Sequence, residues 1–145
     1  MEEQIQEIKR FNRFYIKIMG ILSLYADGSS FSATEAMILY ETSNKKDCTA
    51  KYLSNYFVLD KGYISKILRK FEKRELIERV TSSKDRRVQY IYLTSKGREE
   101  LKKLQDRANE KVEEMIKDIS EQDVGVLIES MNKIEALLET KNRRD

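Results

Sequence analysis

The sequence has 145 residues, of which 40% are hydrophobic and 37% charged, with a net charge of +3, no proline and five glycines. This length suits one domain spanning residues 1–145, and the composition suits a soluble protein with long, uninterrupted helices. Without histidine and with one cysteine, Cys48, the chain lacks the usual zinc ligands, the common general base and any internal disulfide. We therefore expect no metal, no cofactor and no enzymatic activity.

No apolar run reaches the ~18–20 residues that a membrane-spanning helix needs. The first residues are acidic and amphipathic, unlike a secretory signal, and the low cysteine content gives no sign of export. We therefore expect a cytoplasmic protein that does not bind membranes.

The N-terminal segment predicts a long amphipathic helix over residues 3–26, broken by the polar residues 27–30. Its apolar residues recur at spacings of three and four. They are Ile5, Ile8, Phe11, Tyr15, Ile18, Met19, Leu22 and Tyr25. The sequence from Ser32 to Glu35 is a capping box, which predicts a second helix that starts there and ends near residues 43–46.

A short third helix is predicted over residues 49–56, followed by a tight turn at residues 57–60 and a fourth helix over residues 61–74. Asp60 can cap the fourth helix, because a carboxylate suits the positive end of the helix dipole. The apolar stripe of this helix consists of Ile64, Ile67, Leu68 and Phe71. A short helix, a tight turn and a second helix have the spacing of a helix-turn-helix.

The hydrophobic period then changes from helix to strand. Residues 77–82 alternate, residues 88–94 are β-branched and aromatic, and a charged loop separates the two segments, so we predict a β-hairpin. Thr94 can cap a long helix that runs to about residue 119. A last helix, with a weaker capping signal at Ser120, carries an apolar stripe from Val124 to Leu138.

The predicted fold is therefore mainly α with a small β-hairpin wing. Residues 32–97 form a winged helix-turn-helix module, which we expect to bind DNA. Residues 1–27 and 98–145 form flanking helices, whose long apolar faces we expect to mediate dimerisation, because a compact winged module cannot easily cover both. A helical hairpin within one chain is the alternative.

Positive charge is concentrated in residues 61–98. This segment contains twelve Lys or Arg and four Asp or Glu, a net charge of +8, whereas the rest of the chain has 16 bases and 21 acids, a net charge of −5. A positive module within an acidic frame is expected of a protein that binds the phosphate backbone, because each neutralised phosphate releases condensed counterions.

Side chains of the fourth helix that lie off the apolar stripe are candidates for DNA contact. Lys and Arg donate to phosphate or to guanine, and Ser and Tyr also donate to phosphate. Gly62 leaves space for a close approach of backbone and DNA. A solvated helix face is the alternative, but the adjoining basic hairpin favours DNA. The candidates are Lys61, Gly62, Tyr63, Ser65, Lys66 and Arg69.

The hairpin loop supplies a second group of candidates. Lys84, Arg86 and Arg87 are basic, and an arginine at a wing tip can enter a narrow A·T-rich minor groove, where the negative potential is enhanced. Asp85 would repel a facing phosphate, so we expect it to pair with a neighbouring arginine and fix the loop. An ordinary charged turn is the alternative.

The chain resembles the MarR (multiple antibiotic resistance regulator) family of winged helix-turn-helix proteins. The resemblance rests on four stretches, and their combination is specific although each alone is weak. They are residues 59–68 (LDKGYISKIL), residues 76–79 (LIER), residues 85–87 (DRR), which fit the family's Asp-x-Arg, and residues 93–97 (LTSKG), which fit its Leu-Thr-x-x-Gly.

The resemblance implies an obligate homodimer that binds a pseudo-palindromic operator on double-stranded DNA and usually represses transcription. By position, Arg87 would be the minor-groove arginine and Asp85 its orienting partner, while residues 61–66 and Arg69 fall where the recognition helix meets DNA. One departure is Glu75, because many members have glycine there to end the recognition helix.

The resemblance also implies a response to small aromatic or lipophilic effectors bound between the dimer region and the winged module. The side chains that could line such a cavity are Tyr15, Met19, Tyr25, Met37 and Tyr40. A plain hydrophobic core is the alternative. Cys48, in a polar stretch with lysines nearby, is a weak candidate for oxidant sensing.

A rival hypothesis from another class is a protein-interaction module, in which a winged helix with coiled-coil-like ends serves as an adaptor. The salt dependence of duplex binding distinguishes the two hypotheses. The log affinity of a DNA-binding protein falls linearly with log salt concentration, whereas an adaptor does not bind generic duplex.

Overall fold

A computed structural model describes residues 1–20 and 30–142, with side chains as far as residue 139. The helices are α1 (Glu2–Met19), α3 (Ala33–Asn44), α4 (Ala50–Phe57), α5 (Lys61–Lys73), α6 (Ser95–Ile116) and α7 (Glu121–Asn142), and the strands are β1 (Ile77–Thr81) and β2 (Gln89–Leu93). The prediction of a mainly α-helical chain with one antiparallel hairpin is confirmed. None of the described helices is long and apolar enough to cross a membrane.

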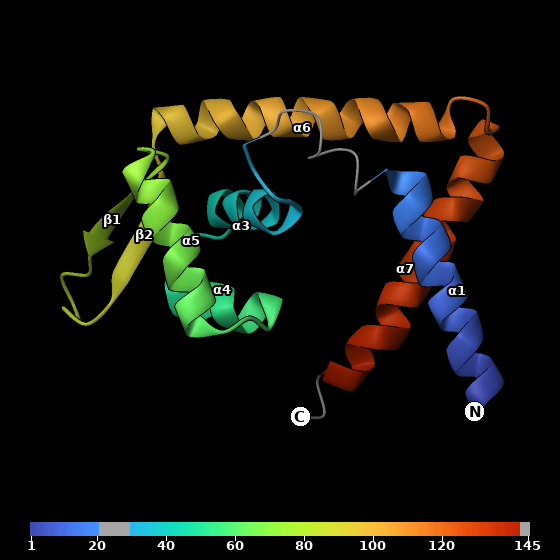
Figure 1. Ribbon diagram of the computed structural model, residues 1–145, viewed down its shortest axis with the longest axis horizontal. Helices are drawn as coiled ribbons and strands as arrows, with labels where there is room; N and C mark the ends of the chain where they lie inside the picture. The colour runs from blue at the N-terminus through green and yellow to red at the C-terminus, as the bar shows by residue number, and fades with distance from the viewer. Residues whose placement is uncertain (21–29, 143–145) are drawn as a thin grey trace.

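The long helix α6 links two groups of elements (Figure 1). Helices α3, α4 and α5 and the hairpin lie by its N-terminal half, and α1 and α7 lie at the other end. Strands β1 and β2 pair antiparallel, with Ile77 opposite Leu93 and Thr81 opposite Gln89. The order of α3, α4, α5, β1 and β2 is that of the predicted winged helix-turn-helix.

Local capping fixes where most of these helices begin. The Ser32 hydroxyl accepts the Glu35 N–H at 3.1 Å and a Glu35 carboxylate oxygen accepts the Ser32 N–H at 2.9 Å, so the predicted capping box is present. Side-chain oxygens cap three further helices by accepting a backbone N–H from the first turn. They belong to Thr49 for α4, Asp60 for α5 and Thr94 for α6.

Two helix ends differ from the prediction. The first helix ends at Met19, not near residue 26, because Gly20 adopts a left-handed backbone (φ 63°) and its N–H donates to the Lys17 carbonyl. Leu22 and Tyr25 lie outside the described residues. The long helix α6 ends at Ile116, three residues before the predicted end, and Ser120 caps the next helix by accepting the Asp123 N–H.

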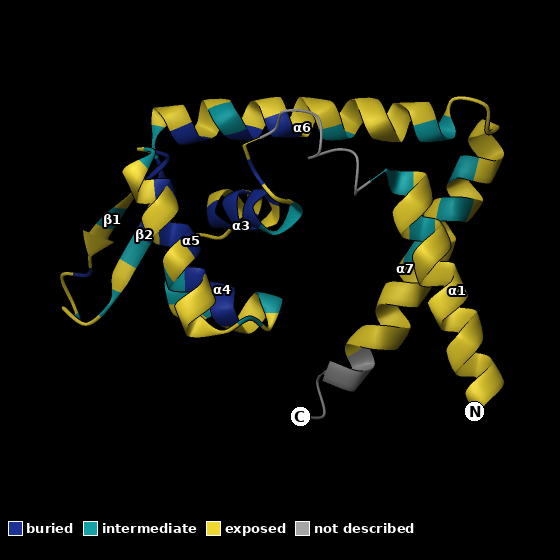
Figure 2. Cartoon of the chain, viewed as in Figure 1, coloured by how far each residue is buried: buried dark blue, intermediate teal, exposed yellow. Residues whose placement is uncertain are grey.

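The hydrophobic core lies inside the winged module and against the first half of α6 (Figure 2). All four apolar residues predicted for the buried face of α5 are buried. Phe71 packs edge-to-face on Phe31, with ring centroids 6.2 Å apart. The core also contains Ile38 and Leu39 of α3, Leu53 of α4, Leu76, Ile77, Ile91 and Leu93 around the hairpin, and Leu101 and Leu104 of α6.

The junction of α5, the hairpin and α6 explains the Leu-Thr-x-x-Gly motif. The Thr94 hydroxyl donates to the Glu75 carbonyl at 2.6 Å, and the Thr94 N–H donates to the Leu76 carbonyl at 3.0 Å. A side chain at Gly97 would place its Cβ 2.0 Å from the Leu76 carbonyl oxygen. Glycine at this position therefore lets α6 start directly against the strand.

Glu75 ends α5 in the conformation that glycine usually adopts. Its φ is 60°, its N–H donates to the Glu72 carbonyl at 2.9 Å, and the Leu76 N–H donates to the Phe71 carbonyl at 2.9 Å. These are the two hydrogen bonds of a Schellman cap. The departure from the family pattern at this position therefore leaves the cap geometry intact.

Helices α1 and α7 contrast with the winged module because their apolar side chains are exposed (Figure 2). No described residue of α1 is buried, although the helix carries isoleucines and phenylalanines over much of its surface. On α7, the side chains of Leu137 and Leu138 are 74% and 64% exposed. A single chain therefore leaves much of these apolar faces uncovered.

Candidate nucleic-acid interface

Helix α5 presents a polar face opposite its buried stripe. Lys61, Lys66 and Arg69 are exposed, and the Tyr63 side chain is 44% exposed. Ser65 is half-buried. Because Asp60 caps the helix and the apolar stripe is buried in the core, the backbone positions of these residues are fixed. Their polar side-chain ends extend into solvent.

The structure gives a second reason for glycine at position 62, besides the predicted space for a close approach of DNA. A Cβ at this position would lie 3.0 Å from the Asp60 carboxylate oxygen that accepts the Gly62 N–H at 3.0 Å. Glycine therefore makes room for the cap itself. It also leaves this one exposed position in the first turn of α5 without a side chain.

Four basic residues of the 61–98 segment are engaged inside the module. Lys70 pairs with Glu35 at 2.7 Å, Arg79 pairs with Glu72, and Arg98 donates to the Leu93 carbonyl at 2.9 Å. Arg74 donates to Ser30 at 3.1 Å and lies over the Phe31 ring at 4.4 Å. These contacts tie α5 to α3, the hairpin to α5, and α6 to the hairpin.

A second set of basic side chains makes no such contact. Among the described residues, no hydrogen bond or ion pair engages the side chains of Lys61, Lys66, Arg69, Lys84 and Arg86, all of which are exposed. The beginning of α5 and the tip of the hairpin both lie on the side of the module that faces away from α6 (Figure 1). The basic side chains without contacts therefore belong to α5 and the hairpin, on the side of the winged module that faces away from α6.

The Glu35–Lys70 pair shows how α5 is held. Burial acts to raise the pKa of Glu35, but hydrogen bonds from Lys70 and Ser32 outweigh it and hold the pKa below the usual value. Glu35 is 9% exposed, so its carboxylate stays ionised in a mostly buried position. The same carboxylate caps α3 and anchors α5.

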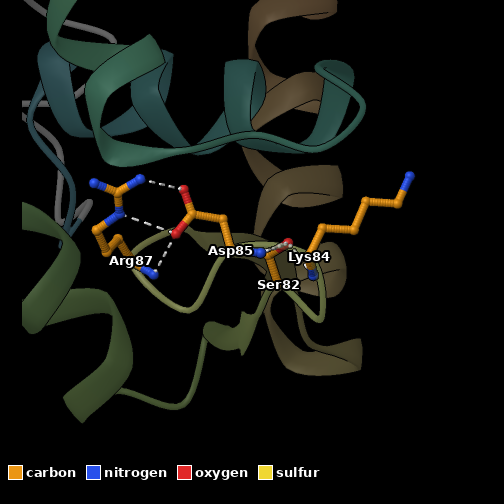
Figure 3. Close-up of polar contacts among 4 residues, drawn as sticks. All are labelled: Ser82, Lys84, Asp85 and Arg87. Carbon is orange, nitrogen blue, oxygen red and sulfur yellow. Dashed lines mark hydrogen bonds and ion pairs between the residues drawn. The ribbon is translucent and has the colours of Figure 1, made fainter.

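The hairpin loop is ordered by side chain to backbone hydrogen bonds (Figure 3). The buried Ser82 hydroxyl accepts the N–H groups of Lys84 and Asp85 at 3.2 and 3.3 Å, and the Val88 N–H donates to the Asp85 carbonyl at 3.0 Å. The loop thus folds back on itself before the second strand begins.

Asp85 holds Arg87 through three hydrogen bonds (Figure 3). One carboxylate oxygen accepts the Arg87 backbone N–H at 3.0 Å and its Nε–H at 3.1 Å, and the other accepts from Nη2 at 3.2 Å. The pairing expected for Asp85 is present, and it lowers the pKa of the Asp85 carboxyl. The Arg87 side chain is nevertheless 91% exposed, so its guanidinium is oriented without being covered.

Helices α3, α4 and α6 enclose a groove of about 820 Å³. Met37 and Tyr40, two of the expected pocket residues, line it, together with apolar and charged neighbours. The neighbours are Ala36, Glu41, Tyr56, Phe57, Leu101, Lys102, Leu104, Gln105, Asp106, Ala108 and Asn109. The Glu41 carboxylate accepts the Tyr52 hydroxyl at 2.6 Å, and this hydrogen bond raises the pKa of Tyr52 to about 12.

The other expected pocket residues are not part of this groove. Tyr15 and Met19 belong to α1, which lies at the opposite end of α6 from α3 (Figure 1). Tyr15 instead stacks on Phe11, with ring centroids 5.9 Å apart. Tyr25 lies outside the described residues.

Cys48 lies in the loop before α4, as predicted, but its side chain is buried. It is 1% exposed and belongs to the hydrophobic core, and its carbonyl accepts the Ile91 N–H at 2.8 Å. Burial raises the pKa of the thiol to about 11, despite a nearby lysine. A buried, protonated thiol is unreactive, which argues against oxidant sensing through this residue.

The comparisons with known proteins agree with this geometry. The MarR family pattern matches residues 31–88. The regulator MhqR of Bacillus subtilis is 26% identical over 123 residues, which is 85% of each chain. The transcriptional regulator BldR of Sulfolobus solfataricus is 26% identical, with a TM-score of 0.72 over 93% of this chain and 96% of that one. FabT of Streptococcus pneumoniae, solved in complex with DNA, is 23% identical, with a TM-score of 0.75 over 97% and 99%.

The elements and their order define a winged helix-turn-helix protein. The match of residues 31–88 to the MarR family and the similarity to these transcriptional regulators confirm the resemblance read from the motifs. That family consists of regulators and not of enzymes.

Proposed function

We propose that this chain is a cytoplasmic, homodimeric repressor that grips a pseudo-palindromic operator with α5 and the hairpin loop. The observation that carries the proposal is the set of exposed, uncommitted basic side chains on these two elements, on one side of the winged module. FabT, whose fold is similar over nearly the whole chain, is solved in complex with DNA, and this supports the same role here.

In this proposal the two elements have separate tasks. The polar face of α5 enters the major groove, where Lys66 and Arg69 donate to phosphates or to guanine edges. The hairpin follows the backbone into the adjacent minor groove, where Arg87 is guided by Asp85. Lys84 and Arg86 add phosphate contacts. Because Asp85 already orients the guanidinium, binding costs less side-chain entropy than it would for a free arginine.

The exposed apolar faces of α1 and α7 support a homodimer. A single chain leaves Ile8, Leu137 and Leu138 more than half exposed, which costs free energy unless a partner covers them. A twofold dimer places two recognition helices about one DNA turn, ~34 Å, apart. Sedimentation equilibrium should then give about twice the chain mass of 17.2 kDa.

The groove between α3, α4 and α6 is the proposed effector site. Met37, Tyr40 and Phe57 offer apolar and aromatic contacts, and the groove touches both the winged module and α6. A small aromatic or lipophilic molecule bound here would shift the module relative to α6 and release the operator. A compound that binds the protein and lowers operator affinity supports this part, and Met37→Trp, which fills the groove, should abolish its effect.

The test of DNA binding starts from duplexes selected from a random pool with the purified protein. Arg87→Ala should lower affinity for the selected operator at least about tenfold at fixed salt, with unchanged circular dichroism. Lys103→Ala is the matched control, because Lys103 is an exposed basic residue of α6 that pairs with Glu100, away from the proposed interface. Equal affinity of the Arg87 variant and wild type would remove Arg87 from the contacts. Absence of any duplex binding at low salt would favour the adaptor alternative.

A further inference from the structure

The turn between α4 and α5 contains a residue in an unfavourable backbone conformation. Val58 has φ 52° and ψ 49°, the left-handed region, where a β-branched side chain meets the greatest steric opposition. Three non-glycine residues adopt a positive φ in the described part of the chain, and Val58 is the β-branched one. Glycine would adopt this conformation without strain.

The surrounding hydrogen bonds hold Val58 in this conformation. The buried Ser54 hydroxyl donates to the Leu59 carbonyl at 2.6 Å, and the Leu59 N–H donates to the Ser54 carbonyl at 3.0 Å. The Val58 N–H donates to the Asn55 carbonyl at 3.4 Å. Side-chain packing does not compensate for the strain, because Val58 is 88% exposed.

Val58 is therefore unfavourable on two independent counts, since its backbone is strained and its apolar side chain lies in water. Strained residues of this kind persist at functional sites, where the side chain is needed. The position fits such a role, because Val58 lies two residues before Asp60, the cap of α5, at the end of α5 that faces away from α6 together with the hairpin tip.

We propose that Val58 is a specificity-determining residue that contacts a thymine methyl group in each operator half-site. The inference rests on the proposed DNA-binding function and deepens it. An isopropyl group has no donor or acceptor, and the C5 methyl of thymine is the apolar group that a base edge offers in the major groove. The contact removes apolar surface from water on both sides and selects thymine at one position of each half-site.

Glu75 supplies a matched control for the strain. It has a comparable backbone conformation (φ 60°) and is exposed, but it lies after the C-terminal end of α5, at the opposite end of the helix from Val58. Val58→Gly and Glu75→Gly should therefore both unfold at or above the wild-type temperature, because each relieves left-handed strain. Only Val58→Gly should change operator binding.

The decisive experiment combines Val58→Gly with operators in which thymines are replaced by deoxyuridine, which lacks only the methyl group, one position per half-site at a time. We expect one position where the replacement weakens wild-type binding about fourfold per half-site, the factor for one methyl group (~0.8 kcal/mol). Val58→Gly should lose about the same factor on the thymine operator and nothing further on the deoxyuridine operator. Glu75→Gly should behave as wild type.

Two outcomes would overturn the inference while leaving DNA binding intact. The first is an operator affinity of Val58→Gly equal to that of wild type. The second is that Val58→Gly loses the same factor of affinity on every deoxyuridine operator as on the thymine operator. Val58→Asn, which tolerates the left-handed conformation without an isopropyl group, checks the result if the glycine variant folds poorly. Failure of the wild-type protein to bind any duplex would instead sink the proposed function, and this inference with it.

Discussion

Replacing Gly97 with alanine tests how the winged module is fastened to α6. An added Cβ would lie 2.0 Å from the Leu76 carbonyl oxygen and 3.0 Å from its carbonyl carbon. Both Leu76 atoms belong to a buried backbone segment that accepts the Thr94 N–H at 3.0 Å. An ordinary contact of 3.4 Å requires the start of α6 to move by about 1.4 Å, the difference from 2.0 Å.

The cost of this movement follows from the contacts that it breaks. Two hydrogen bonds lengthen beyond bonding distance: the one from the Thr94 N–H to the Leu76 carbonyl and the one from the Thr94 hydroxyl to the Glu75 carbonyl. Each is worth about 1 kcal/mol. Strain in the core adds about 1–3 kcal/mol. The sum is roughly 3–5 kcal/mol, a large share of the ~5–15 kcal/mol that stabilises a typical domain. The unfolding temperature should fall by about 10 °C.

Urea and thermal unfolding, followed by circular dichroism at equal protein concentration, measure this loss. Gly125→Ala is the control, because no atom lies within 4 Å of a Cβ added at this exposed position of α7. It should stabilise the chain by about 0.5–1 kcal/mol through helix propensity alone. A Gly97→Ala variant within about 1 kcal/mol of wild type would refute the proposed close fit of α6 against Leu76.

Two further predictions concern buried polar groups. The pKa of the Cys48 thiol is raised to about 11, so at pH 8 the native protein should react with a disulfide reagent only as fast as local unfolding exposes the thiol. The urea-unfolded chain should react at once. A rapid reaction of the native protein would contradict the burial of Cys48. The pKa of Glu35 is lowered on folding, so its ionic contribution is present above the unfolded value near 4.5 and is lost as pH falls through the folded value. Glu35→Gln should therefore be less stable than wild type at pH 7, and urea titrations should show the difference shrinking as the pH falls below 4.5. A difference independent of pH would exclude the charge as its source.

Elements governed by local signals are those that the sequence predicts well. Ser32, Asp60 and Thr94 act on backbone groups within three residues, so their caps can be predicted without knowledge of the tertiary fold. The periodicity of the α5 stripe identifies its buried face for the same reason. Gly20 shows the limit, because a glycine within a helical pattern is tolerated in some helices and ends others.

The structural features that could not be predicted from the sequence depend on contacts between residues that are distant in the chain. Lys70 and Glu35 are far apart in sequence, so nothing local distinguishes Lys70 from Lys66, although one is engaged within the module and the other is exposed and uncommitted. Cys48 lies in the predicted loop, but its burial depends on distant residues, because the loop is joined to β2 by the hydrogen bond from the Ile91 N–H to the Cys48 carbonyl. The strain at Val58 is likewise visible only in the backbone.

The salt dependence of duplex binding tests the central claim most directly. The five selected basic side chains of α5 and the hairpin loop are Lys61, Lys66, Arg69, Lys84 and Arg86. Doubled in a dimer, they allow a slope of log affinity against log salt down to about −9. Fluorescence anisotropy with the selected operator, between about 50 and about 200 mM salt, should give a linear dependence with a slope of about −5 to −9. A slope near zero, or no binding at the lowest salt, would contradict the claim that α5 and the hairpin together hold DNA.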